Sequence, residues 1–168
     1  YLNGSAVATA TTTPSSSLNF NGMETWIGNY YAGNNSFDGK ISNVAIWTQA
    51  ISAEDVLYLY NGGTPQTSLS FEPLSWWKLD NLTTGIQDSG SASNNGTNNG
   101  ATEVTDSVAV DQWNFDNVSQ AQTPNWSSAL GFDGTNDYIN IPYNANITPQ
   151  TGNFTISAWI NSDNLSSW

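Results

Sequence analysis

The sequence contains no cysteine and no histidine, and only two of its 168 residues, Lys40 and Lys78, are basic. The lack of cysteine excludes disulfide bonds, thiol catalysis and cysteine-ligated zinc. The lack of histidine removes the commonest general base and the commonest transition-metal ligand. Nucleic acids and anionic membranes are bound through clustered Lys or Arg, so we expect neither as a partner.

Long hydrophobic runs are missing as well. No apolar stretch approaches the ~20 residues that a transmembrane helix needs, so we expect no membrane insertion. Charged residues make up only 10% of the chain and the formal net charge is −12, so Asn, Ser, Thr and Gly supply most of the polarity. Hydrophobic residues nevertheless make up 38%, including eight Trp, which is enough for a packed core. This composition is typical of β-sandwiches and solenoids at cell or particle surfaces.

Short β-prone runs separated by Asn-Gly, Asp-Gly and Ala-Gly-Asn-Asn turns predict an antiparallel all-β fold. The strongest run alternates cleanly and places Phe154, Ile156, Ala158 and Ile160 on one face. Nothing in the order of the runs requires parallel strands joined by crossover helices. The predicted strands contain residues 18–20, 25–28, 41–47, 130–132, 138–141 and 154–160.

One short helix is predicted near residues 52–61. Ser52 can cap its N-terminus with Asp55 three residues later, and Gly62 is placed to end it. An apolar stripe that must lean on a sheet is formed by Val56, Leu59 and Tyr60. Beyond the helix, the Pro-containing residues 63–75 predict a connector, and the Ser/Asn/Gly-rich residues 83–101 predict a long loop.

Two ordered groups of segments resemble laminin-G-like (LamG) domains of the concanavalin A-like jelly-roll fold. The first is "FDGKISNVAIWTQAISAEDVLYLYNGG" at 37–63, which resembles the closing part of such a domain. The second resembles the opening part and comprises "WWKLDN" at 76–81, "DSGSASNNGTNNGATEV" at 88–104, "ALGFDGTNDYINIP" at 129–142 and "FTISAWINSDNLSSW" at 154–168. The resemblance implies an all-β, concanavalin A-like antiparallel sandwich with one short helix.

The order of these segments implies a division of the chain into parts of two modules. Residues 1–63 correspond to the C-terminal half of one LamG-like module, residues 64–74 to a linker, and residues 75–168 to the N-terminal half of a following module. The chain therefore resembles a fragment of a longer protein with tandem modules. Arrays of this kind are similar to large structural or appendage proteins of marine bacteriophages and to bacterial surface adhesins.

The resemblance implies a non-catalytic module, extracellular or on a virion surface, that serves adhesion, glycan recognition or structural spacing. Its expected partners are a glycan or cell-surface receptor and other copies or virion proteins. One alternative is a glycoside hydrolase of the same fold with its catalytic strand outside this sequence. Another is a purely structural capsid decoration or fibre protein.

Catalytic carboxylates would be the mark of the hydrolase alternative. Such enzymes set two or three acidic residues on one strand, in a pattern such as Glu-x-Asp-x-x-Glu, so that acid and nucleophile face one cleft. None of the glutamates lies in such a pattern, and we expect no enzymatic activity and no catalytic residue. The glutamates are Glu24, Glu54, Glu72 and Glu103.

A calcium ion is a candidate cofactor, because Ca²⁺ takes six to eight oxygen ligands from carboxylates, amides and turns. The sequence "DGTND" offers Asp133, Asn136 and Asp137 within five residues, and Asp80 and Asp88 could add ligands from a neighbouring loop. The alternative is that these side chains only accept backbone N–H bonds in turns.

Aromatic side chains in polar, loop-like surroundings are candidate ligand-binding residues, since a sugar ring stacks its C–H face on Trp or Tyr. Those in such surroundings are Tyr30, Tyr31, Trp113 and Trp126. The alternative is core packing, which the alternating patterns favour for Trp47, Trp77 and Trp159.

Overall fold

A computed structural model describes residues 1–7, 22–30, 36–104, 128–147 and 153–163. Within these ranges the chain forms eight strands, one α-helix and two short 3₁₀ helices. In chain order they are β1 (Thr25–Ile27), β2 (Asp38–Trp47), α1 (Ala53–Tyr60), η1 (Asn61–Gly63), β3 (Ser75–Trp77), β4 (Thr97–Asn99), β5 (Thr102–Val104), β6 (Ala129–Asp133), β7 (Tyr138–Ile141), η2 (Ala145–Ile147) and β8 (Thr155–Ser162).

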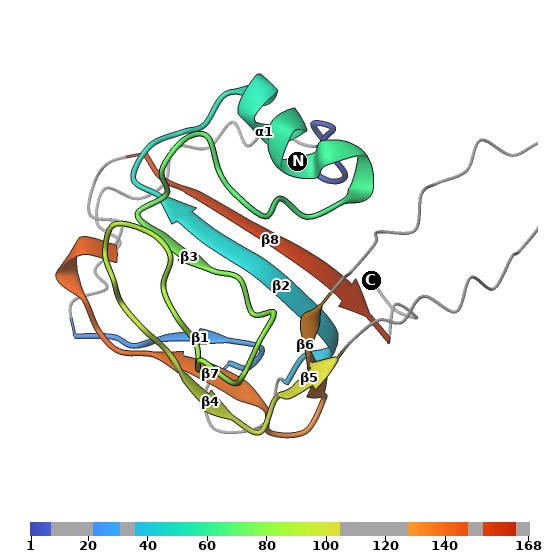
Figure 1. The fold of residues 1–168 in the computed structure, drawn as a ribbon, viewed down its shortest axis with the longest axis vertical. Coiled ribbons are helices and arrows are strands. Elements are labelled where there is room, and N and C mark those ends of the chain that lie inside the picture. The colour runs from blue at the N-terminus through green and yellow to red at the C-terminus, as the bar shows by residue number, and fades with distance from the viewer. Residues whose placement is uncertain (8–21, 31–35, 105–127, 148–152, 164–168) are drawn as a thin grey trace, which may run out of the picture.

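The larger sheet is organised around β2. One edge of β2 pairs with β6 along residues 38–41 and with β3 along residues 44–46. The other edge pairs with β8 over almost its whole length, and β5 extends the sheet beyond β6. All of these pairings are antiparallel, so β2 is the central strand of a five-stranded sheet (Figure 1).

An extra residue in β2 sets which side chains face which way. Opposite β8, the register shifts by one residue between Ser42 and Ala45. Asn43 lies in this bulge with a φ of 50°, and its side-chain oxygen accepts a hydrogen bond from Trp76 Nε1 at 3.1 Å. The bulge changes the phase of the alternation, so that Ile41 and Val44, three residues apart, face the same core.

The smaller sheet has the order β1-β7-β4, and its pairings are also antiparallel. Ile27 pairs with Ile139, and both side chains point toward the larger sheet, where they are buried with Ile141. The main core fills the space between the two sheets. It comprises Ile27, Ile41, Val44, Ile46, Trp77, Leu79, Ile86, Ala101, Leu130, Phe132, Ile139, Ile141 and Ile147.

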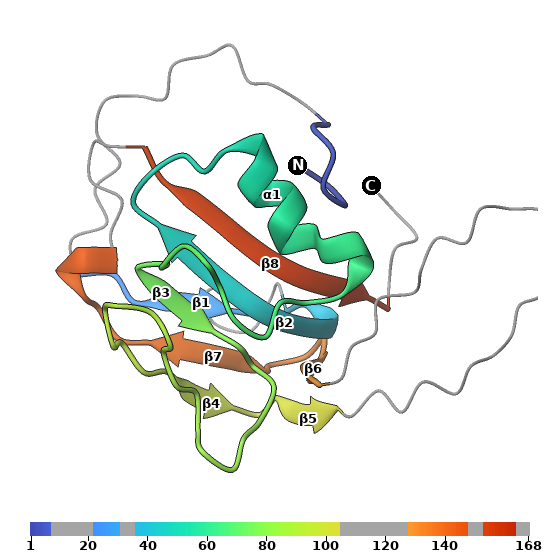
Figure 2. The same cartoon turned by 45° about the horizontal axis from the view of Figure 1, so that its top comes forward.

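Helix α1 covers the opposite face of the larger sheet, which makes a three-layer arrangement (Figures 1 and 2). Ser52 and Asp55 form the predicted capping box, and Asn61 ends the helix with a φ of 43°. Under this layer lies a second apolar cluster of Ala45, Trp47 and Trp76, packed against Ile51, Leu59, Leu69 and Phe71. No helix in the described ranges is long and apolar enough to cross a membrane.

The predicted elements can be compared directly with this fold. The predicted run at 18–20 lies outside the described residues. Each of the other five predicted runs coincides with a strand, and α1 lies within the predicted helix. The prediction of a continuous loop over 83–101 is wrong at its end, because Thr97–Asn99 forms β4. Trp47 and Trp77 are buried in the core as predicted, whereas Trp159 is only half-buried and stacks on Tyr60.

The two predicted half-modules lie in contact. Strands β1 and β2 come from the first segment, and they pair with β7, β3, β6 and β8 from the second. Both sheets are therefore built from both segments. The assignment of the segments to two consecutive modules stays a prediction.

The bulge in β2 gives a stability prediction. Asn tolerates the left-handed conformation at position 43, whereas a β-branched residue there is strained by about 1–3 kcal/mol. Asn43→Val should therefore lower the free energy of unfolding, measured by urea denaturation, by about 2–4 kcal/mol once the lost Trp76 bond is added. Asn43→Gly loses only the hydrogen bond and should cost about 1 kcal/mol. Equal losses for the two variants would show that the backbone at Asn43 does not determine the bulge.

Candidate functional site

The outward face of the smaller sheet carries a group of aromatic and polar side chains. Ile139 and Ile141 of β7 point into the core, so the alternating residues Tyr138 and Asn140 point away from it. Asn140 pairs with Trp26 of β1 on one side and with Thr97 of β4 on the other. One rung across all three strands therefore presents an indole, an amide and a hydroxyl on the same face.

Trp26 and Tyr138 stack on each other on this face. Their ring centroids are 4.5 Å apart and the ring planes are inclined by only 17°. Both side chains are half-buried, so part of each ring remains accessible to solvent. The stack holds the two rings in one orientation, which spares a ligand the entropy of ordering them.

Glu24 links this aromatic pair to the neighbouring strand. Its Oε2 accepts hydrogen bonds from Trp26 Nε1 at 3.3 Å and from Asn140 Nδ2 at 2.8 Å. Its second oxygen, Oε1, accepts no hydrogen bond from a described residue and can accept one from a ligand hydroxyl. We call Glu24, Trp26, Tyr138, Asn140 and Thr97 the aromatic sheet face.

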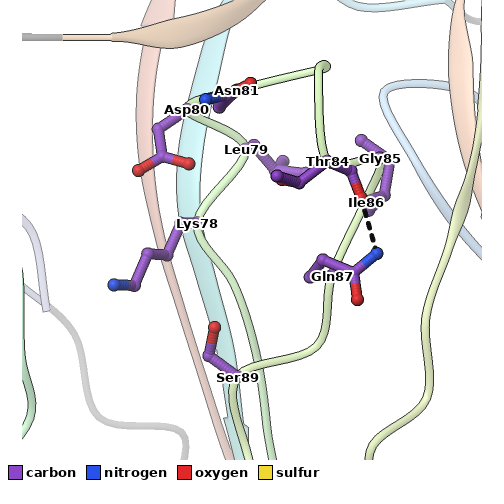
Figure 3. A pocket seen from close by; sticks show the side chains of 9 residues that line it. All are labelled: Lys78, Leu79, Asp80, Asn81, Thr84, Gly85, Ile86, Gln87 and Ser89. Carbon is purple, nitrogen blue, oxygen red and sulfur yellow. Dashed lines mark hydrogen bonds between the residues drawn. The ribbon is translucent and has the colours of Figure 1, made fainter.

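A polar cavity of about 260 Å³ lies elsewhere, in the loop that follows β3. Its lining residues are Lys78, Leu79, Asp80, Asn81, Thr84, Gly85, Ile86, Gln87 and Ser89 (Figure 3). Gln87 Nε2 donates to the Thr84 carbonyl at 2.7 Å, and Lys78 Nζ donates to the Thr67 carbonyl at 3.1 Å. The carboxylate of Asp80 makes no hydrogen bond or ion pair with any described residue. The cavity therefore offers hydrogen-bonding groups, but no aromatic ring lines it.

The two acidic residues of this loop differ sharply in their surroundings. Asp88 Oδ1 accepts hydrogen bonds from the backbone N–H groups of Trp76 and Gly90, and Oδ2 accepts one from Asn94, all at 2.8 Å. Asp88 thus ties the loop to β3, while Asp80 lines the cavity. Asp88 is not among the residues that line the cavity.

The carboxylates of the "DGTND" turn also accept hydrogen bonds from backbone N–H groups. Asp133 Oδ1 accepts from the backbone N–H of Thr135 at 2.8 Å, and Asp137 Oδ2 accepts from that of Asp133 at 3.0 Å. Asp137 is only 7% exposed, whereas Asn136 is exposed. Among the described residues, no three acidic side chains gather into a group that could hold a metal ion. These bonds match the alternative of turn-forming carboxylates, and a calcium site stays a prediction.

The predicted ligand-binding aromatics fall mostly outside the described ranges. Tyr31, Trp113 and Trp126 lie outside them. Tyr30 is described; it follows β1, and its side chain is 74% exposed. Sequence reasoning missed Trp26 and Tyr138. The signal that could have found them is alternation, because each is next to an Ile that belongs to the core.

Residues 1–57 match the family model Laminin_G_3, which describes the concanavalin A-like lectin/glucanases superfamily. The first third of the chain is similar to this superfamily. No curated protein and no solved structure matches the chain. The match, two antiparallel sheets and a short helix together confirm the predicted concanavalin A-like β-sandwich. The match also supports the LamG-like resemblance over the segment that contains β1, β2 and most of α1.

The contrast between Asp88 and Asp80 gives a second prediction. Asp88→Ala leaves three backbone N–H groups without their acceptor and should lower the free energy of unfolding by about 3 kcal/mol. Asp80→Ala removes the same group from a site without hydrogen bonds and should change stability by less than about 0.5 kcal/mol. Thermal unfolding followed by circular dichroism measures both. A similar loss in the two variants would contradict the assigned roles.

Proposed function

We propose that the chain is a non-catalytic glycan-recognition module that binds an uncharged sugar at the aromatic sheet face. The observation that carries the proposal is the stacked Trp26–Tyr138 pair with Glu24 hydrogen-bonded beside it. Sugar recognition needs both an apolar ring surface and fixed hydrogen-bonding groups, because a pyranose has an apolar C–H face and a hydroxyl rim. This face combines the two.

The geometry suits a sugar laid against the outward face of the sheet. A pyranose face can pack on the accessible part of Trp26 or Tyr138. Its hydroxyl groups can then donate to Glu24 Oε1 and exchange hydrogen bonds with Asn140 and Thr97. Adjacent strands lie about 4.8 Å apart, so the three strands span roughly the length of two sugar rings. The similarity to a superfamily of lectins and glucanases is consistent with such a ligand.

The number of carboxylates favours binding over hydrolysis. Glycoside hydrolases use two carboxyl groups, separated by about 5–5.5 Å or 6.5–9.5 Å, on either side of the bond that they cleave. The aromatic sheet face contains one carboxylate, Glu24, and the loop cavity contains one, Asp80. A hydrolase would need two carboxylates at one of these separations, and it would release reducing sugar.

We further propose that the module works outside the cell or on a virion, as part of a phage appendage or an adhesin. The low content of charged residues and the LamG-like resemblance support this setting. The alternative is a purely structural role, which predicts that the chain binds no glycan. A measurement of glycan binding therefore separates the structural role from glycan recognition.

The test is affinity electrophoresis in native gels that contain a soluble β-glucan, xylan or mannan, where the net charge of −12 drives the protein toward the anode. We expect at least one neutral polysaccharide to retard the chain. Trp26→Ala should weaken that binding about tenfold or more, because ring stacking contributes about 0.5–1.5 kcal/mol beyond burial of area. Glu24→Gln, which keeps the side-chain shape, should weaken it as well.

Two control variants decide between sites. Tyr30→Ala removes an exposed aromatic ring outside the stack, and Asp80→Asn changes the loop cavity, so both should bind like the unaltered chain. Loss of binding in Tyr30→Ala or Asp80→Asn, with full binding by Trp26→Ala, would move the site away from the aromatic sheet face. No retardation by any neutral polysaccharide would contradict the proposed function.

A further inference from the structure

Two opposite charges line the loop cavity without pairing with each other. Lys78 and Asp80 are two residues apart, and both side chains are half-buried in the cavity wall. Figure 3 shows the two side chains leaving the backbone on the same side. Neither forms an ion pair with a described residue, so the cavity presents a cation and an anion that are both available to a ligand.

The ammonium group of Lys78 is already held in position. Its Nζ donates a hydrogen bond to the Thr67 carbonyl at 3.1 Å and lies 4.6 Å from the centroid of the Trp76 ring. An ammonium group carries three donor hydrogens, so two remain for a ligand. Because the side chain is ordered by these contacts, a ligand need not supply the entropy cost of fixing it.

The residue between the two charges has a strained backbone. Leu79 has a φ of 54°, a left-handed conformation that is unfavourable for a residue with a Cβ. Its side chain is buried in the main core, and the Lys78 carbonyl accepts a hydrogen bond from the Asn43 backbone N–H at 2.8 Å, which together hold the conformation. Strain of this kind gathers at ligand-binding sites. Its position between Lys78 and Asp80 therefore supports a ligand site in this cavity.

We propose that the cavity binds a small zwitterion, a molecule with one ammonium and one carboxylate group, such as a free amino acid. The carboxylate of the ligand pairs with Lys78 Nζ, and its ammonium group pairs with the Asp80 carboxylate. Gln87 and Ser89 also line the cavity and supply further hydrogen-bonding groups. The volume of about 260 Å³ is below the 300–1,000 Å³ typical of pockets for drug-sized ligands, so the ligand is small.

Charge favours a zwitterion over a ligand with a single charge. A net charge of −12 repels an anion, and a carboxylate alone would leave Asp80 unpaired. A cation alone would pair with Asp80 but would meet Lys78 as a like charge. A zwitterion has no net charge and pairs with both residues. The proposal does not depend on glycan binding, which uses the aromatic sheet face.

The test is an NMR titration of the ¹⁵N-labelled chain at constant ionic strength. The probes are glycine, β-alanine, 4-aminobutanoate and 6-aminohexanoate, in which the two charges lie progressively further apart. Methylammonium and acetate are the controls with one charge. We expect at least one zwitterion to shift the backbone amides of residues 79–89 saturably, with a dissociation constant at least tenfold lower than that of either control.

Three variants locate the binding. Asp80→Asn and Lys78→Gln should each raise the dissociation constant about tenfold or more, because each removes one charge-assisted hydrogen bond. Glu72→Gln is the matched control, since Glu72 is exposed and does not line the cavity, and it should bind like the unaltered chain. Unchanged cross-peaks outside the loop show that a variant is folded.

Three outcomes would each overturn the proposal. The first is the absence of a saturable shift with all four zwitterions. The second is methylammonium binding as tightly as the best zwitterion, which would indicate a simple cation site. The third is an unchanged dissociation constant in folded Asp80→Asn, or an equal rise in Glu72→Gln, which would show that the cavity carboxylate does not hold the ligand.

Discussion

The hydrogen bonding of β2 along both of its edges is the interaction on which the rest of the structure depends. One edge holds β3 and β6, and the other holds β8. The bulge at Asn43 then directs Ile41, Val44 and Ile46 to the core between the sheets, and Ala45 and Trp47 to the layer under α1. Because both faces of β2 are buried, this strand fixes the position of the helix, the second sheet and the aromatic sheet face together.

Alternation was enough to predict most strands, and the Ser52–Asp55 spacing was enough to predict α1. Which side chains of β2 face the core could not be predicted from alternation. Strict alternation in "ISNVAIW" places Ile41 and Val44 on opposite faces, and only the positive φ of Asn43 brings them together. Strand β4 escaped prediction because its sequence, Thr-Asn-Asn, is typical of turns, and it is extended because β7 pairs with it.

The candidate site was less accessible to sequence reasoning, for a physical reason. Residue type alone does not distinguish a carboxylate that accepts three backbone N–H bonds, as Asp88 does, from one that lines a cavity, as Asp80 does. Trp26 and Tyr138 are far apart in the chain, and the β1–β7 pairing brings them together. The separation of inward and outward faces on short strands becomes visible only when the neighbouring strand is known.

The most direct test of this account is native-state hydrogen exchange measured by NMR on the backbone amides of β2 and β7. If both segments fold as one sandwich around β2, the slowest amides of the two strands exchange through the same global opening. Their free energies of opening should then agree within about 0.5 kcal/mol. A much lower value for β7, with β2 still protected, would mean that the smaller sheet is an independent unit and would contradict the account.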